Sequence, residues 1–326
     1  MSQIKWGIVG CGAVTEVKSG PAFYKTQDSS LHAVAARNKL KAIEYAKRHQ
    51  VTRVFDTVEE LILSPDIDAV YIATPPSSHM PLTLKVAAAG KPCCVEKPMA
   101  MNYTECEKML AAFEKIQQPL FVAYYRRSLP RFLQIKNWLN EKQIGEVRQV
   151  NWLFAKPANE FDLRKKTNWR TDPKIAGAGY FMDLACHGLN LFQFLLGDIV
   201  AAKGFSQNQQ QLYDAEDAVS ACWLFANGIL GSGSWNFAAY QRLDEVQIIG
   251  DKGRIVFSMF NDQAIKLETE KHSKSMEIAN PAHVQYFHVH NMNQHLRQKS
   301  THPSLGESAA RTNWIMDKIL GNSEVV

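Results

Sequence analysis

Short apolar runs alternate with amphipathic stretches along the first 123 residues of the chain. Six apolar runs have the length and composition of buried strands. They occupy residues 4–9, 31–36, 54–55, 69–73, 92–95 and 120–123. The amphipathic stretches between the later runs predict helices at about 39–48, 57–63, 82–89 and 102–117. Strands that alternate with helices over short joins are typical of a parallel, doubly wound α/β sheet, which we predict for residues 1–123.

From residue 124 onward the strands follow one another, and hairpin signals join them. The expected strands are 146–154, 201–205, 218–225, 229–237, 245–249, 254–260 and 265–268. The expected helices are 132–139, the apolar stretch after the glycines at 177–179, and 307–320. Strands joined by hairpins pair antiparallel. We therefore predict that residues 124–326 form an α+β domain around a large, mainly antiparallel open sheet.

One face of that sheet is expected to lie under the helices of the same domain. Four aromatic residues alternate with other positions at the period of a strand with one buried face. They are Trp223, Phe225, Trp235 and Phe237. This spacing assigns them to the core or to a subunit interface rather than to a cofactor site.

The composition limits the partners and the environment of the protein. The 326 residues are 46% hydrophobic and 21% charged, which is ordinary for a globular protein. The formal charge of +5 is modest and its lysines and arginines are dispersed, so nucleic acid is not expected as a partner. No apolar run reaches the roughly 20 residues that cross a membrane, and we expect no signal peptide before the first strand. Six cysteines without a C-x-x-C pair indicate a reduced, cytoplasmic protein.

The turn after the first strand carries the first candidate chemistry. Gly10-Cys11-Gly12 leads directly from that strand into an amphipathic stretch. In a Rossmann fold, the first glycine of such a turn permits a tight bend and the second lets the backbone approach a pyrophosphate. The third glycine of the full motif is missing, so a glycine-rich turn without a ligand is the alternative. The strand before and the helix after favour a dinucleotide site at Gly10, Gly12, Ala13 and Val14.

The end of the second strand indicates which dinucleotide binds. An acidic residue there hydrogen-bonds the ribose 2′-hydroxyl of NAD, whereas an arginine accommodates the 2′-phosphate of NADP. The chain has Arg37 at this place, and no acid follows until Glu44. Arg37 therefore favours NADP(H) over NAD(H), and a solvated loop charge is the alternative.

Ligands of a doubly wound sheet bind at the carboxyl ends of its strands. The later strand ends place residues 74–76, 96–98 and 124–127 along the same edge as the glycine turn. The most specific motif among them is Glu96-Lys97-Pro98. A lysine donates to a substrate oxygen and stabilises developing charge, or acts as an acid or base when it is desolvated. A surface charge is the simpler interpretation of Lys97 when it is taken alone.

Asp183 and His187 follow a glycine-rich stretch and are four residues apart. On a helix this spacing places both side chains on one face. Histidine is the side chain best suited to proton transfer near neutral pH. A helix that buries one satisfied histidine, with Asp183 near its positive end, explains the same residues without chemistry. Both interpretations stay open on these residues alone.

Taken together, the motifs resemble those of the Gfo/Idh/MocA oxidoreductases over essentially the whole chain. The resemblance is carried by Gly10-Cys11-Gly12, Thr74-Pro75-Pro76 with His79, Glu96-Lys97-Pro98, and Asp183 with His187. This family includes glucose–fructose oxidoreductase, inositol dehydrogenase, 1,5-anhydrofructose reductase and dimeric dihydrodiol dehydrogenase. One departure is Asn190, which stands where many relatives have an acid.

The resemblance implies roles for individual residues. It implies that Lys97, Asp183 and His187 are the catalytic group and that Lys97 lies beside the nicotinamide and the substrate. The residues implied for the nicotinamide half of the cofactor are Thr74, Pro75, His79 and Glu96. No metal ligands are implied, and the histidines after residue 280 lack the cysteine or carboxylate cluster of a metal site.

Four further positions match family features. Trp169 and Arg170 match a Trp-Arg pair near the cofactor in the members that resemble anhydrofructose reductase. Arg127 matches the arginine that the family often carries after the sixth strand, and Tyr125 stands beside it. The resemblance thus implies that Tyr125 and Arg127 contact the substrate along with the catalytic group.

The implied activity is hydride transfer between NADP(H) and a secondary alcohol or ketone of a sugar, cyclitol or related diol. The resemblance also implies a homodimer or homotetramer that forms through the open face of the second sheet. One alternative is an aromatic dihydrodiol or tetrapyrrole-type substrate on the same fold. Another is a non-catalytic regulator that senses a dinucleotide. Lys97, Asp183 and His187 argue against the regulator, because a sensor needs no proton-transfer groups.

Overall fold

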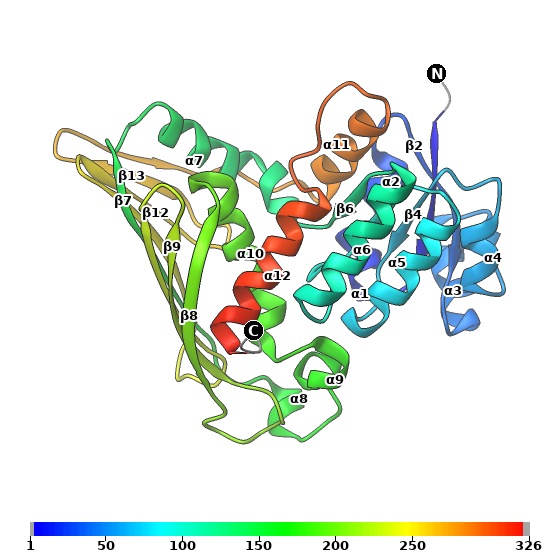
Figure 1. Cartoon of the computed structure of the whole chain (residues 1–326), viewed down its shortest axis with the longest axis horizontal. Coiled ribbons are helices and arrows are strands. Elements are labelled where there is room, and N and C mark those ends of the chain that lie inside the picture. Colours follow the sequence, from blue (N-terminus) through cyan, green and yellow to red (C-terminus); the bar gives the residue numbers. More distant parts are fainter. Residues whose placement is uncertain (1–2, 322–326) are drawn as a thin grey trace. The chain divides into compact units, whose positions relative to one another are not determined.

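The computed structural model of this chain describes residues 3–321, which fall into two compact units (Figure 1). The first unit contains the residues up to Ser128 together with Pro281–Ala310. The second contains Leu129–Asn280 and the residues from Arg311 onward. Within residues 3–321, no helix is both long and apolar enough to cross a membrane.

The first unit is built on a six-stranded sheet in the order β3-β2-β1-β4-β5-β6. Its strands are β1 (Ile4–Val9), β2 (Ser29–Ala35), β3 (Arg53–Val54), β4 (Ala69–Ile72), β5 (Cys93–Val95) and β6 (Leu120–Val122). Every pairing in this sheet is parallel, and the strand order reverses between β1 and β4. The predicted doubly wound sheet is confirmed. Ligands of such sheets bind beside the point of reversal, where the glycine turn follows β1.

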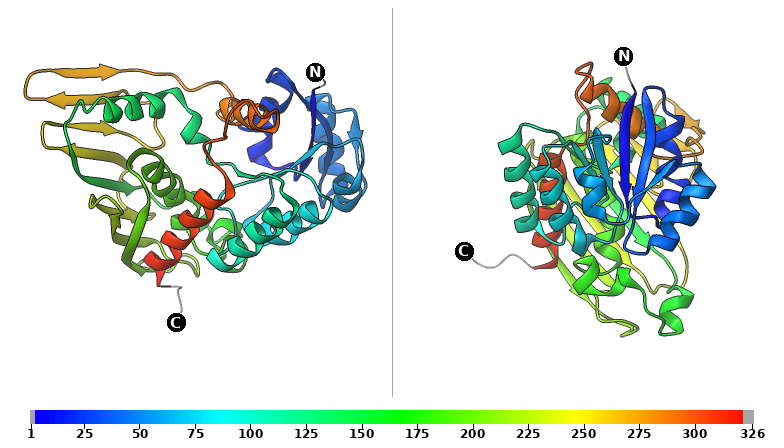
Figure 2. Two further views of the ribbon diagram at one scale, coloured as in Figure 1. Left: turned by 45° about the horizontal axis from the view of Figure 1, so that its top comes forward. Right: turned by 90° about the vertical axis from the view of Figure 1, so that its right-hand side faces the viewer.

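Helices cover both faces of this sheet (Figure 2). They are α1 (Ala13–Val17), α2 (Gly20–Lys25), α3 (Lys39–His49), α4 (Val58–Leu63), α5 (His79–Ala88), α6 (Tyr103–Ile116) and α11 (Tyr286–Leu296). Short 3-10 turns cover Pro76–Ser78 and Tyr125–Ser128. Side chains cap α3, α4 and α6. At the start of α6, Asn102 accepts the Glu105 N–H at 2.9 Å.

The segment Pro281–Ala310 contributes α11 to the first unit. The Trp6 indole N–H donates to Asn293 over 3.0 Å, and both side chains are fully buried. The Ser304 hydroxyl donates to the carbonyl oxygen of Val122 over 2.9 Å. These bonds attach a late part of the chain to the first and the last strand of the parallel sheet.

The second unit is built on an eight-stranded sheet in the order β14-β13-β12-β11-β7-β10-β9-β8. Its strands are β7 (Val147–Ala155), β8 (Ile199–Gln207), β9 (Ala218–Phe225), β10 (Leu230–Asn236), β11 (Leu243–Gly250), β12 (Gly253–Phe257), β13 (Ile265–Thr269) and β14 (Ser273–Met276). β7 and β10 pair parallel, and the other pairs are antiparallel. The predicted, mainly antiparallel sheet is confirmed, with β14 as an unpredicted edge strand.

Helices cover one face of this sheet (Figure 1). The second unit contains α7 (Pro130–Asn140), α8 (Glu160–Leu163), α9 (Pro173–Ala176), α10 (Tyr180–Leu196) and most of α12 (Gly306–Leu320). Trp152 of β7 lies at the centre of the core, with its ring centre 5.3 Å from that of Trp235 and 5.9 Å from that of Phe192. Trp223, Phe225, Trp235 and Phe237 are all buried, so the predicted core role of these aromatic residues is confirmed.

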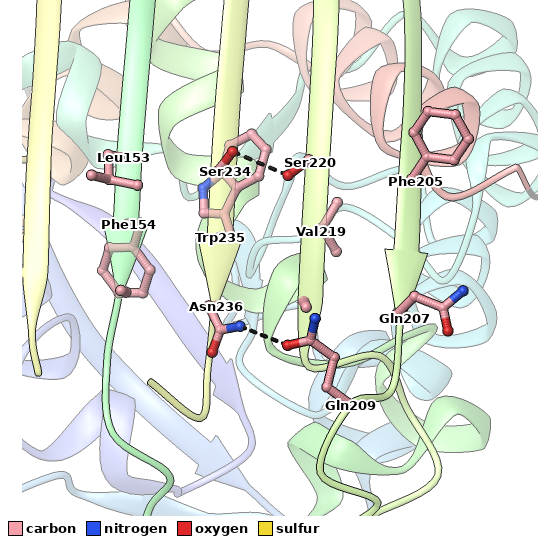
Figure 3. A pocket seen from close by; sticks show the side chains of 12 residues that line it. Leu153, Phe154, Phe205, Gln207, Gln209, Val219, Ser220, Ser234, Trp235 and Asn236 are labelled. Carbon is pink, nitrogen blue, oxygen red and sulfur yellow. Dashed lines mark hydrogen bonds between the residues drawn. The ribbon is translucent and has the colours of Figure 1, made fainter. Parts of the chain in front are cut away.

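The other face of the sheet carries exposed apolar side chains (Figure 3). Phe205 is 79% exposed, and Leu230 and Leu153 are 61% and 49% exposed. A shallow hollow of about 310 Å³ lies over β7, β10, β9 and β8. Among the residues that line this hollow, the hydroxyls of Ser220 and Ser234 are hydrogen-bonded to each other at 3.1 Å.

Candidate active site

The glycine turn after β1 fits the pyrophosphate of a dinucleotide. Gly10 has φ +101°, and a side chain there would lie 2.6 Å from the carbonyl oxygen of Ala73, the residue after the neighbouring strand β4. Gly12 is exposed, and a side chain there would project into open space. The backbone of Gly12 is therefore accessible to a ligand. Ala13 and Val14 begin α1, where N–H groups have no acceptor within the helix.

Arg37 lies two residues beyond the end of β2 and is exposed. The next residue, Asn38, caps α3 by accepting the N–H of Lys41 over 3.2 Å. The first turn of α3 contains no acidic residue. The place where an NAD site carries a carboxylate for the ribose therefore carries a cation instead.

Glu96 is buried and accepts hydrogen bonds from three directions. Its Oε1 accepts from the Tyr71 hydroxyl at 2.5 Å and from the Gln285 amide at 2.7 Å. Its Oε2 accepts from the backbone N–H of Lys97 at 3.2 Å. Burial and the Glu96 carboxylate raise the pKa of Tyr71 well above its usual range, so this hydroxyl stays protonated and donates. The carboxylate thereby holds the backbone that carries the half-buried Lys97.

His79 contacts the backbone of the two loops that follow β4 and β5. Its ring nitrogens lie 2.7 Å from the Thr74 carbonyl oxygen and 2.9 Å from the Pro98 carbonyl oxygen. The side chain is fully buried, and burial lowers the pKa of His79. A neutral ring has one N–H, so one of the two carbonyls receives a hydrogen bond at a time. The peptide bond from Lys97 to Pro98 is cis.

Arg127 and Tyr125 lie in the 3-10 turn that follows β6. Arg127 is buried, and its guanidinium donates to the Pro303 carbonyl oxygen over 2.8 Å. Tyr125 is half-buried, and the guanidinium of Arg126 lies 5.0 Å from its ring centre. Arg127 thus joins the end of the parallel sheet to the 281–310 segment. Contact of Arg127 and Tyr125 with a substrate stays a prediction.

In the second unit, α10 carries the other two predicted catalytic residues. Asp183 stands in the first turn, and its carboxylate lies 3.3 Å from the Arg170 guanidinium. His187 is one turn further and 6% exposed, with its ring centre 5.9 Å from that of Phe260. The Arg170 guanidinium in turn lies 4.4 Å from the ring centre of Trp169. The structure therefore places Trp169 and Arg170 beside α10, with Arg170 paired to Asp183.

A buried polar network positions the loop that carries Trp169 and Arg170. The Tyr180 hydroxyl donates to the Asp162 carboxylate at 2.6 Å. It accepts from the amides of Asn159 and Asn168 at 2.6 and 2.7 Å. Asn168 also caps the turn at Trp169 by accepting the Arg170 N–H over 3.2 Å. No motif in the sequence indicates these bonds, because Asn and Asp are ordinary residues of a polar loop.

Two more polar residues fix the position of α10. Asn190 is buried and donates to the Thr312 hydroxyl at 3.0 Å, so it joins α10 to α12 inside the core. Glu216 accepts the Gly179 N–H, which precedes the first turn of α10, at 3.0 and 3.1 Å. Burial raises the pKa of Glu216 to about 7. The sequence pattern did not single out Glu216.

The predicted site residues thus form two groups. In the first unit, the glycine turn, Arg37, the Thr74 to His79 loop, and Glu96 with Lys97 all follow strands of the parallel sheet. In the second unit, Asp183, His187 and Arg170 gather at the start of α10. Among residues 3–321, no three His, Cys, Asp or Glu side chains are grouped to hold a metal ion.

Comparisons with known proteins cover nearly the whole chain. A family model described as an oxidoreductase family with an NAD-binding Rossmann fold matches residues 4–124, and the GFO/IDH/MocA C-terminal domain matches residues 132–256. Oxidoreductase P35 of Formosa agariphila is 40% identical over 98% of this chain and 99% of its own length. The trans-1,2-dihydrobenzene-1,2-diol dehydrogenase of Bos taurus is 27% identical over 77% of this chain and 72% of its own.

The solved structures add a likeness in fold. The aldose-aldose oxidoreductase of Caulobacter crescentus matches with a TM-score of 0.85 over 97% of this chain and 96% of that one. The two sequences are 21% identical. This match therefore concerns the architecture of both domains and carries no statement about substrate.

Proposed function

The chain belongs to the Gfo/Idh/MocA family of oxidoreductases, and from this premise we propose an NADP(H)-dependent dehydrogenase. It transfers hydride between the nicotinamide and a secondary alcohol, or the matching ketone, of a sugar, cyclitol or related diol. The observation that best supports this proposal is the geometry of α10, where Arg170 holds Asp183 one helical turn before His187.

When bound, the nicotinamide accepts or supplies the hydride, and the protein supplies alignment and proton transfer. His187 takes the proton of the substrate hydroxyl during oxidation and returns it during reduction. Lys97 donates to the same substrate oxygen and stabilises the charge that develops there. Asp183 orients the substrate hydroxyl, and Arg170 keeps the Asp183 carboxylate in place.

The bovine relative supports a substrate with neighbouring hydroxyl groups. It is named for a dihydrodiol, which carries hydroxyl groups on adjacent carbons. An aromatic dihydrodiol is the second candidate substrate, and the 27% identity to the bovine enzyme supports it.

Arg37 supports NADP(H) as the preferred cofactor. It stands exposed beyond β2, where a carboxylate of an NAD site would otherwise lie. We expect Arg37→Asp to raise the Kd for NADP⁺ at least tenfold and to leave the Kd for NAD⁺ within about threefold, because NAD⁺ has no 2′-phosphate. Fluorescence titration of both cofactors measures this. An Arg37→Asp variant that keeps its NADP⁺ affinity would remove the basis for the preference.

The open face of the second sheet supports a homodimer or homotetramer. Phe205, Leu230 and Leu153 are exposed there, and such apolar side chains on one face mark an interaction surface. The molar mass in solution, measured by light scattering, tests the assembly.

A panel of sugars, cyclitols and diols tests the activity. Nicotinamide absorbance is followed with NADP⁺ and NAD⁺ side by side. We expect turnover with NADP⁺ that falls at least a hundredfold in Lys97→Met. The control is Lys85→Met, an exposed lysine of α5 that pairs with Glu59, and it should keep full activity. Intact NADPH binding without oxidation of any alcohol or reduction of any matching ketone would instead identify a non-catalytic sensor.

A further inference from the structure

Two cationic side chains face each other where β7 ends and β11 begins. Antiparallel pairing places Leu243 opposite Ala155, so one step beyond the strands Arg242 faces Lys156. Like charges that face each other across an antiparallel pair destabilise it. These two cations therefore do not stabilise the sheet, and their presence needs another explanation.

Lys156 and Arg242 point to the face of the sheet that the helices cover. Phe154, two residues before Lys156, is buried on that face, and residues two apart in a strand share a face. The Lys156 ammonium lies 3.9 Å from the ring centre of Tyr180, the first residue of α10. The Arg242 guanidinium lies 5.8 Å from the ring centre of Phe154. Both cations therefore reach toward the end of α10 that carries Asp183.

The nearby carboxylates are engaged elsewhere. Asp183 pairs with Arg170. Asp162 accepts a hydrogen bond from the hydroxyl of Tyr180. Within residues 3–321, neither Lys156 nor Arg242 forms an ion pair with a carboxylate. Lys156 is half-buried at this place, and Arg242 is exposed.

A half-buried ammonium without a carboxylate partner costs free energy, because burial removes water from the charge. Burial lowers the pKa of Lys156. The nearby carboxylates of Asp162 and Asp183 raise it, and the smaller effects of Arg242 and Arg170 lower it. A bound anion would supply the missing partner. Lysine and arginine bind carboxylates well, since both donate charge-assisted hydrogen bonds.

We infer that Lys156 and Arg242 bind the carboxylate of an acidic sugar, so that the substrates of this enzyme are uronic or aldonic acids. The inference rests on the proposed function, because it takes Asp183 as a residue that faces the substrate. Tyr180 precedes Asp183 by three residues, or about 4.5 Å along the helix axis. The inference places the reacting hydroxyl of the sugar at Asp183 and its carboxylate at Lys156, on the same face of α10.

Matched pairs of acidic and neutral sugars test the inference. D-glucuronate is compared with D-glucose, and D-galacturonate with D-galactose, in NADP⁺-dependent assays of the full-length enzyme. D-glucose 6-phosphate is included as a sugar with a different anion. The variants are Lys156→Met, Arg242→Gln and the control Lys166→Met, whose lysine lies over the ring of Phe161 at 5.7 Å.

We expect kcat/KM to be at least tenfold higher for the acid than for the neutral sugar of each pair. Lys156→Met should raise KM for the acid at least tenfold, with kcat within about threefold, and leave the neutral sugar unchanged. Arg242→Gln should act in the same direction, and Lys166→Met should change nothing. Equal loss on acidic and neutral sugars would show that Lys156 only packs on Tyr180. Preference for the sugar phosphate would overturn the carboxylate assignment.

Failure of the proposed function is distinguishable from failure of this inference. If no sugar is oxidised, calorimetric titration of D-glucuronate into the enzyme with NADP⁺ decides. If glucuronate binds at least tenfold more weakly to Lys156→Met than to the wild type, the anion site is supported and the proposed reaction is wrong. The absence of any difference between glucuronate and glucose in the wild type overturns the anion site.

Discussion

Replacing Glu96 by glutamine tests the network that holds the Lys97 backbone. The carboxylate accepts three hydrogen bonds, two at Oε1 and one at Oε2. An amide has one oxygen, so its NH₂ group must face either the Lys97 N–H or the two donors from Tyr71 and Gln285. With the Tyr71 hydroxyl and the Gln285 amide oriented as they are, either orientation places a donor against another donor inside a buried site.

The expected cost follows from these contacts. The orientation that keeps both short bonds loses the 3.2 Å bond from Lys97. Loss of a hydrogen bond to a charged group costs about 1.5–3 kcal/mol, and the two remaining bonds become neutral and weaker. We expect Glu96→Gln to lower the free energy of unfolding by about 2–4 kcal/mol, and to lower kcat because the Lys97 backbone loses its acceptor.

Denaturant unfolding followed by circular dichroism measures this change. The control is Glu59→Gln, which removes the charge from an exposed glutamate paired with Lys85 and should cost less than about 1 kcal/mol. A Glu96→Gln protein as stable as the wild type would refute the reasoning, because three donors would then not depend on the carboxylate.

Two further changes test other parts of the structure by denaturant unfolding. The folded-state pKa of Glu216, about 7, lies above its ordinary value of 4.5, so the folded protein retains a proton that the unfolded chain releases. The stability from this proton is fully present below pH 4.5 and is lost as the pH rises to 7, at about 1.4 kcal/mol per pH unit. Glu216→Gln, whose side-chain oxygen still accepts the Gly179 N–H, should therefore match the wild type at pH 4.5 and exceed it by about 2–3 kcal/mol at pH 8; equal stabilities at pH 8 would contradict this. Trp6→Phe removes the donor to buried Asn293 and should cost about 1–3 kcal/mol, whereas an unchanged midpoint would show that this bond does not hold α11.

The elements of both sheets were predictable because their signals are local. Strands of the first unit are short apolar runs, and helix starts such as Asn102 have a side chain that accepts a nearby N–H. Edge strand β14, with the polar sequence Ser273–Met276, has no such signal and forms by pairing with β13.

Contacts between distant parts of the chain could not be predicted. Trp6 and Asn293 are 287 positions apart, and neither residue alone indicates that the 281–310 segment packs in the first unit. The domain boundary at residues 123 and 124 stays a prediction.

The candidate site also contains residues that the sequence could predict and contacts that it could not. Gly10, Lys97 and His187 stand in motifs, so their roles could be proposed from the sequence. The ion pair of Arg170 with Asp183 depends on how a polar loop folds back onto α10, which no spacing reveals.

The measurement that tests the central claim most directly is a double-mutant cycle on kcat with Lys97→Met and His187→Asn. Groups that act in one chemical step are not additive. We predict that each single variant lowers kcat by about 10²–10⁴, and that the double variant lies within about tenfold of the slower single one. Full activity of either single variant, or losses that multiply in the double variant, would contradict a shared role of Lys97 and His187 in one hydride-transfer reaction.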